Sequence, residues 1–185
     1  MGKTYEAITP QLAVWIQRQS MFFVGTAPSG DDGHVNVSPK SPIGTLRILD
    51  EHTVAYLDLV GSGAETIAHV KENGRIVVML CAFDGPPRIL RLHGHAEVLE
   101  HDAVAFPDVD VLSEQLRTVV QVDVERIADS CGYGVPLMDY VGERSNSRRW
   151  AEGKLAKEGP DALEQYKVEK NTLSIDGLPA LVHSG

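Results

Sequence analysis

The residues best suited to chemistry lie in a short segment, Gly61-Ser62-Gly63-Ala64-Glu65-Thr66, between a predicted strand and a predicted helix. Two hydroxyl groups and the unpaired backbone N–H groups of a helix start would converge there. Such a helix end attracts phosphate because the helix dipole adds partial positive charge. The same letters also match the S-x-x-E capping box, in which Ser62 and Glu65 satisfy the helix start themselves. The segment therefore predicts either a phosphate site or a structural helix cap.

A second candidate is the segment Asn36-Val37-Ser38-Pro39-Lys40. Pro39 ends a predicted strand, so Lys40 projects from the strand end beside Asn36 and Ser38. A lysine in that position can neutralise a phosphate group. The alternative is an ordinary solvated lysine in a turn.

Other familiar sites are not predicted. His93 and His95 share one face of a predicted strand, but no third ligand stands at a telling spacing, so we predict no metal site. The G-x-S-x-G, H-E-x-x-H, P-loop and G-x-G-x-x-G patterns do not occur. Hydrolase, zinc protease and nucleoside triphosphatase functions therefore lose their usual support, and no catalytic side chain is predicted.

Composition narrows the class of partner. The chain has 185 residues, 43% of them apolar, and a formal net charge of −9. That length predicts one domain, and the negative charge disfavours nucleic acid and anionic membrane surfaces as partners. No segment has the apolar length of a signal peptide core or a membrane-spanning helix, so we expect a cytoplasmic protein.

The elements that must position these residues are mostly strands. Apolar runs or strict alternation predict six of them, over residues 21–27, 34–38, 53–59, 75–83, 88–100 and 118–125. In the second, Val35 and Val37 are expected to face the core, with His34, Asn36 and Ser38 on the opposite face. Turns and short helices join the strands, which favours an antiparallel barrel or sandwich with helices at its rim. A parallel α/β sheet is the lesser alternative.

The order of these pieces resembles a known family. The segments Phe22 to Thr26, Gly33 to Lys40, Gly61 to Val70, Arg75 to Phe83 and Arg91 to Ala96 follow one another as in the pyridoxamine 5′-phosphate oxidase-like flavoproteins, across roughly residues 10 to 135. The resemblance implies a mainly β (α+β) fold, a six-stranded antiparallel split β-barrel with peripheral helices. It also implies a homodimer that holds FMN in two clefts at the subunit interface. Residues 1–142 would form the FMN-binding split barrel, and residues 143–185 a helical appendage of the same domain.

The resemblance also assigns roles to residues. The strand of Val35 to Lys40 would run beside the isoalloxazine ring, with Lys40 near the phosphate. The strand end at Asp58 and the following helix start would contact the phosphate and the ribityl chain. Trp150 would cover the flavin of the partner subunit or pack within its own. The implied cofactor-binding residues are Asn36, Val37, Ser38, Lys40, Asp58, Ser62, Gly63, Thr66 and Trp150.

Two departures limit the function that the resemblance implies. Enzymes that oxidise pyridoxamine phosphate carry an Arg-Lys pair at the helix start, where this chain has Glu65-Thr66. They also carry an R-x-H element near the C-terminus, where this chain reads Ser174 to Pro179. Vitamin B6 oxidation is therefore not assigned. We expect an FMN-binding oxidoreductase acting on an unidentified small molecule; the alternatives are a non-catalytic haem- or flavin-binding carrier, or a structural relative that binds nothing.

Overall fold

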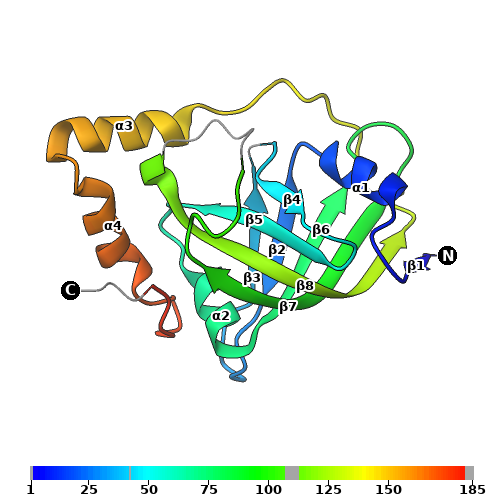
Figure 1. The fold of residues 1–185 in the computed structure, drawn as a ribbon, viewed down its shortest axis with the longest axis horizontal. Helices are drawn as coiled ribbons and strands as arrows, with labels where there is room; N and C mark the ends of the chain where they lie inside the picture. The colour runs from blue at the N-terminus through cyan, green and yellow to red at the C-terminus, as the bar shows by residue number, and fades with distance from the viewer. Residues whose placement is uncertain (1, 42, 107–112, 182–185) are drawn as a thin grey trace.

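One antiparallel sheet dominates the computed structural model, which describes residues 2–41, 43–106 and 113–181 (Figure 1). Its described strands are β1 (Thr4–Tyr5), β2 (Phe22–Thr26), β3 (Asn36–Lys40), β4 (Leu46–Ile48), β5 (Thr53–Leu59), β6 (Arg75–Cys81), β7 (Ile89–Leu99) and β8 (Leu116–Ser130). The helices of the described residues are α1 (Pro10–Gln17), α2 (Glu65–Asn73), α3 (Asn146–Glu158) and α4 (Ala162–Asn171).

The sheet curls into a barrel that is split along one side. The strand order is β3-β2-β6-β7-β8-β5-β4, with β1 added to β8, and every pairing is antiparallel. Among the described residues no pairing joins β3 to β4, so these two strands form the edges of the split. The antiparallel split barrel is thus confirmed and the parallel α/β alternative is wrong, because α2 carries the chain from β5 across to β6 rather than to a parallel neighbour.

The core fills the inside of the curled sheet. Tyr56 is the largest fully buried side chain, and its ring meets Phe22 edge to face at a centroid distance of 5.5 Å. Helix α1 covers one end of the barrel with Leu12 and Ile16. It begins as the sequence predicts, since the hydroxyl of Thr9 accepts a hydrogen bond from the backbone N–H of Leu12 at 3.2 Å.

All six predicted strands are present, and β1 and β4 are two further strands that the sequence did not predict. These strands span two and three residues, which is too short for alternation to be recognised. The expected orientation of the second strand is wrong. Val35 and Val37 are 72% and 65% exposed, while Asn36 and Ser38 turn toward α2. The reason is that β3 is an edge strand whose inner face meets hydroxyl groups rather than the apolar core.

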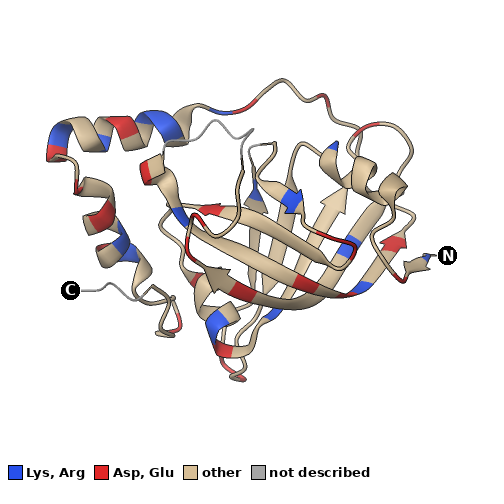
Figure 2. Ribbon diagram, in the orientation of Figure 1, with Lys and Arg blue, Asp and Glu red and all other residues tan. Residues whose placement is uncertain are grey.

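Helices α3 and α4 form an appendage beside the barrel (Figure 1). The ring of Trp150 packs edge to face on Tyr166 at a centroid distance of 4.9 Å and so joins the two helices. The ammonium of Lys167 donates to the carbonyl of Leu116 at 3.2 Å, which ties α4 to β8. Basic and acidic residues are distributed over both barrel and appendage (Figure 2). Within the described residues, no helix combines the length and apolar character needed to cross a membrane.

The packing of β7 against β8 should depend on Gly94, because a Cβ atom there would lie 1.9 Å from the carbonyl oxygen of Asp123. We expect Gly94→Ala to lower the free energy of unfolding by about 1–3 kcal/mol, measured by urea denaturation. Gly153→Ala in α3 is the matched control, since a Cβ there meets no atom within 4 Å. It should leave stability unchanged or raise it by about 0.5–1 kcal/mol. Equal stability of the two variants would contradict this account.

Candidate functional site

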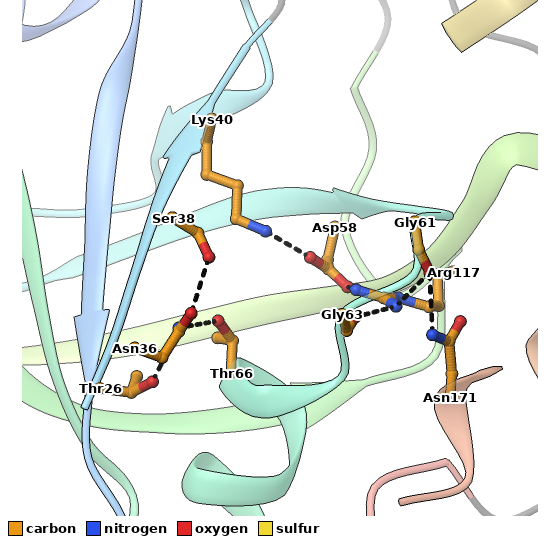
Figure 3. Close-up of polar contacts among 10 residues, drawn as sticks. All are labelled: Thr26, Asn36, Ser38, Lys40, Asp58, Gly61, Gly63, Thr66, Arg117 and Asn171. Atoms are coloured by element: carbon orange, nitrogen blue, oxygen red, sulfur yellow. Dashed lines mark hydrogen bonds and ion pairs between the residues drawn. The ribbon is translucent and has the colours of Figure 1, made fainter. Parts of the chain in front are cut away.

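A buried ion cluster joins the two sides of the split barrel (Figure 3). We use the name ion cluster for Lys40 on β3, Asp58 on β5 and Arg117 on β8. The ammonium of Lys40 lies 2.8 Å from one carboxylate oxygen of Asp58. The guanidinium of Arg117 donates to the other oxygen from Nη2 at 2.6 Å and from Nε at 2.7 Å. Both carboxylate oxygens of Asp58 are therefore occupied by cations.

The cluster is deeply placed in the protein. The side chains of Asp58, Arg117 and Lys40 are 0%, 4% and 17% exposed. Burial acts to raise the pKa of Asp58, but the charges of Lys40 and Arg117 and their hydrogen bonds outweigh it and hold the pKa below its usual value. Removing one member of such a buried pair costs about 3–5 kcal/mol, because the remaining charge loses its partner. Lys40 is the member of the cluster that reaches the surface.

Sequence reasoning missed Arg117, because a β-bulge directs its side chain. In the pairing of β5 with β8, Asp58 faces Thr118 but Leu59 faces Leu116, so Arg117 is the extra residue on β8. A bulge of this kind re-aims the side chain of the extra residue. The residues around Arg117 in the sequence show only the alternation of a strand. They do not indicate whether its side chain contacts Asp58 or solvent.

Arg117 also holds the turn that precedes α2. Its Nη1 donates to the carbonyl oxygen of Gly63 at 2.7 Å, and the amide of Asn171 donates to the carbonyl oxygen of Gly61 at 2.9 Å (Figure 3). Two side chains from distant parts of the sequence thereby fix the carbonyl groups of this turn. Ser62, between them, is exposed.

The start of α2 is not closed by a capping box. The helix begins at Glu65 with Ala64 as N-cap and no side-chain cap, so the predicted reciprocal contact of Ser62 and Glu65 is wrong. Glu65 instead accepts a hydrogen bond from the backbone N–H of Ile175 at 3.3 Å, because the C-terminal segment packs against this helix. Among the described residues the backbone N–H groups of Glu65 and Thr66 have no acceptor.

A hydrogen-bonded network of polar side chains runs from β3 to α2. The amide nitrogen of Asn36 donates to the hydroxyls of Thr26 at 3.1 Å and Thr66 at 3.0 Å. The hydroxyl of Ser38 donates to the amide oxygen of Asn36 at 3.0 Å. Thr26 in turn bonds Nδ1 of the buried His69 at 3.1 Å. These contacts explain why the polar face of β3 turns inward.

His69 closes this network inside the protein. It is fully buried, and its Nε2 has no hydrogen-bond partner among the described residues. Burial lowers the pKa of His69, although the nearby carboxylates of Asp176, Glu65 and Glu72 act in the opposite direction. The imidazole is therefore neutral at neutral pH.

The C-terminal segment reaches back over the same region. The carboxylate of Asp176 accepts from the backbone N–H of His34 at 2.9 Å and meets its Nδ1 at 2.6 Å. Ala180 packs against Ala64 and Ile67 of the α2 region. The C-terminal segment therefore connects the start of α2 with the residue that precedes the β3 region, His34.

The structure brings most of the predicted site residues together, with two exceptions. The side chain of Val37 is exposed, on the face of β3 opposite Asn36 and Ser38. Trp150 lies in the appendage against Tyr166, and its placement over a partner's flavin stays a prediction. The residues that gather around β3, the ion cluster and the start of α2 are Asn36, Ser38, Lys40, Asp58, Ser62, Gly63 and Thr66.

The histidine pair on β7, His93 and His95, belongs to no larger ligand set in the described residues. His95 pairs with Glu125 at 3.0 Å, and Nδ1 of His93 has no partner among the described residues. No group of three potential metal ligands occurs in the described part of the chain. This pair is the only support in the sequence for the haem-binding alternative, which the described structure does not test.

Comparison with known proteins identifies relatives along most of the chain. The sequence pattern of the family described as pyridoxamine 5′-phosphate oxidase matches residues 8–131. A curated relative, the pyridoxamine 5′-phosphate oxidase family protein ustO of Aspergillus flavus, is 38% identical over 192 residues, covering 96% of this chain and 77% of the relative.

Solved structures give weaker likenesses. The conserved hypothetical protein Rv2991 of Mycobacterium tuberculosis has a TM-score of 0.49 at 15% identity, covering 75% of this chain and 96% of that one. An FMN-binding protein of Syntrophomonas wolfei has a TM-score of 0.42 at 15% identity, covering 62% of this chain and 79% of that one.

The buried His69 should make stability depend on pH. Because its pKa is lowered in the folded protein, the unfolded chain takes up a proton first as pH falls through about 6.5, and stability is lost below that pH. The slope from this one group is at most about 1.4 kcal/mol per pH unit. The free energy of unfolding, measured by urea denaturation between pH 5 and 7, should depend less on pH in His69→Gln than in wild type. His52→Gln, which changes an exposed histidine, should keep the wild-type dependence; an unchanged dependence in His69→Gln would refute the assignment.

Proposed function

The chain belongs to the pyridoxamine 5′-phosphate oxidase family, and from that premise we propose that it is an FMN-binding oxidoreductase acting on a small molecule. The observation that carries the proposal is the ion cluster beside the open start of α2. Lys40 supplies a surface-reaching ammonium there, and the helix supplies unpaired N–H groups. This combination of groups suits a monophosphate better than it suits a neutral ligand.

The donors at this place fit the phosphate end of FMN. Lys40 uses one N–H group on Asp58 and an ammonium has three, so two remain for a phosphate. Ser62 and Gly63 are exposed in the adjoining turn, where a hydroxyl and backbone N–H groups are accessible. Glu65 opposes an anion at the same helix start: Ile175 binds one of its oxygens, and the other lies beside Gly63, so a phosphate at this turn requires the end of the partly exposed Glu65 side chain to turn aside. Lys40, Ser62, Gly63 and Thr66 would therefore hold the phosphate and the adjoining ribityl chain.

The polar network along β3 supports the placement of the flavin ring. Ser38 and Asn36 are only partly buried and are held in place through Thr26 and Thr66. A planar ring with hydrogen-bonding edges can lie along such a strand, which is the arrangement that the family implies for β3. The partly buried Asn36 and Ser38, together with the backbone at Val37, would orient its polar edge.

The protein's contribution to the reaction is binding and orientation. FMN, when bound, supplies the electron chemistry itself. Asp58 holds Lys40 and Arg117 in place, and His69 fixes Asn36 through Thr26. We assign no general acid or base, because Lys40 is paired with Asp58 and would be engaged by the phosphate, and His69 is fully buried.

We also propose that the site is completed by a second copy of the chain. Val35 and Val37 expose apolar side chains on the outer face of the β3 region, whose inner face carries Asn36 and Ser38. A dimer that covers this outer face would bury exposed apolar area and exclude water from the edge strand. The second subunit would then form one side of the flavin site. Trp150 of that subunit is a candidate residue to cover the flavin.

Flavin binding is the direct test. Purified protein should bind added FMN, with quenched flavin fluorescence and a shifted visible absorbance band. Replacing both Lys40 and Ser62 with Ala should weaken FMN binding about tenfold or more, because an ammonium and a hydroxyl donor are lost. Lys157→Ala removes an exposed lysine of α3 and should leave affinity unchanged. A wild-type protein that leaves FMN fluorescence unaltered would end the proposal.

The dimer is tested by sedimentation equilibrium. Wild-type protein should sediment with about twice the mass of one chain, and Val35→Glu should shift it toward the monomer because a charge cannot be buried unpaired in an apolar contact. Val168→Glu is the control, since Val168 is an exposed residue of α4. A monomeric wild type, or a Val35→Glu variant that stays dimeric, would remove this interface.

A further inference from the structure

We propose that Arg117 determines whether the site prefers a phosphorylated flavin over the same flavin without phosphate. This inference rests on the proposed function and adds a residue that neither the sequence analysis nor the family resemblance assigned. Arg117 is 4% exposed and its donors are directed to Asp58 and the turn before α2. It is therefore a positioning residue that acts through its neighbours, without touching the cofactor.

The first step of the argument is the balance of charge. Two carboxylates lie at this end of the site, the buried Asp58 and the partly buried Glu65 at the start of α2. Lys40 and Arg117 are the two cations that face Asp58, and they balance both carboxylates. Without Arg117 one negative charge would be in excess, in a region where low exposure weakens the screening by water. A phosphate dianion would then meet repulsion instead of a neutral setting with open N–H groups.

The second step is that Lys40 and Arg117 share the carboxylate of Asp58. Its two oxygens are divided between the cations, one to the ammonium of Lys40 and the other to the guanidinium of Arg117. If Arg117 is lost, Lys40 becomes the only counter-charge for a fully buried carboxylate and is held by it more strongly. The ammonium would then be less able to turn its remaining N–H groups toward a ligand. Arg117 thus leaves Lys40 available.

The third step is geometry. The guanidinium bridges Asp58 at the end of β5 and the carbonyl of Gly63 just before α2 (Figure 3). A planar fork with several fixed donors can serve both acceptors at once, which a lysine ammonium on a flexible stem does less well. The contact with Gly63 ties the turn to Asp58 and thereby fixes the position of the helix start.

The test compares FMN with riboflavin, which differ only in the phosphate. We would titrate each into wild-type and variant protein, follow flavin fluorescence, and take the ratio of the riboflavin Kd to the FMN Kd. The wild-type ratio should be well above one. Arg117→Gln should lower the ratio about tenfold, through weaker FMN binding with riboflavin binding little changed. Arg117→Lys should fall between the two, since it keeps the charge and loses the fork.

A compensating variant separates charge from simple stability. Asp58→Asn combined with Arg117→Gln removes one charge of each sign, which restores the balance and frees Lys40. It should recover the ratio to within about threefold of wild type. Asp58→Asn alone leaves both cations unopposed by Asp58 and should raise the ratio above wild type. Because the double variant leaves no unpaired buried carboxylate, it should fold even if Arg117→Gln does not.

The controls distinguish the possible failures. Arg126→Gln removes an exposed arginine from the same strand and should leave the ratio unchanged. Equal losses for both flavins in Arg117→Gln, or a double variant whose ratio stays low, would overturn this inference while the proposed function stands. A wild type that binds FMN and riboflavin equally would also overturn it. A wild type that binds neither flavin would remove the proposed function itself.

Discussion

The structure depends on one buried carboxylate at the split of the barrel. β3 is the first strand of the curled sheet and β5 the sixth, yet Lys40 and Asp58 on these strands are 2.8 Å apart. No ladder of hydrogen bonds joins these two strands in the described sheet, so the ion pair is a direct link across the opening of the barrel. Arg117 completes the neutralisation of Asp58 and connects the opening to the start of α2.

An ion cluster in this place has two consequences at once. A buried charge is costly unless it is paired, so Asp58 imposes the positions of both cations. The same pairing keeps a lysine at the surface of the opening in one orientation, next to a helix start that no side chain caps. Under the proposed function, stability and phosphate binding would therefore depend on the same three residues. If all three residues were fully buried and bonded only to one another, the cluster could stabilise the fold but could not contact a ligand. Lys40, however, remains partly exposed.

Family members that oxidise pyridoxamine phosphate are expected to carry basic residues at the helix start, where this chain has Glu65 and Thr66. Here the guanidinium comes from β8, placed by a bulge, and reaches the turn before the helix from the other side. One carboxylate oxygen of Glu65 accepts from the backbone N–H of Ile175, and the other lies beside Gly63. The chain can thus keep positive charge near the start of α2 with a different set of residues, and the C-terminal segment takes part in arranging them.

The sequence by itself determined six of the eight described strands and the start of α1, and it named the residues that gather around β3 and the start of α2. Alternation in β7 and the Thr9 cap of α1 are local patterns, and local geometry is enough to read them. The tertiary structure alone decided which face of β3 is buried, because Asn36 turns inward only when Thr66 stands opposite to bond it. It alone decided the role of Arg117, since a bulge aims this side chain at a carboxylate fifty-nine residues away in the chain. Contacts of that kind depend on register and on the curl of the sheet, which no short stretch of residues encodes.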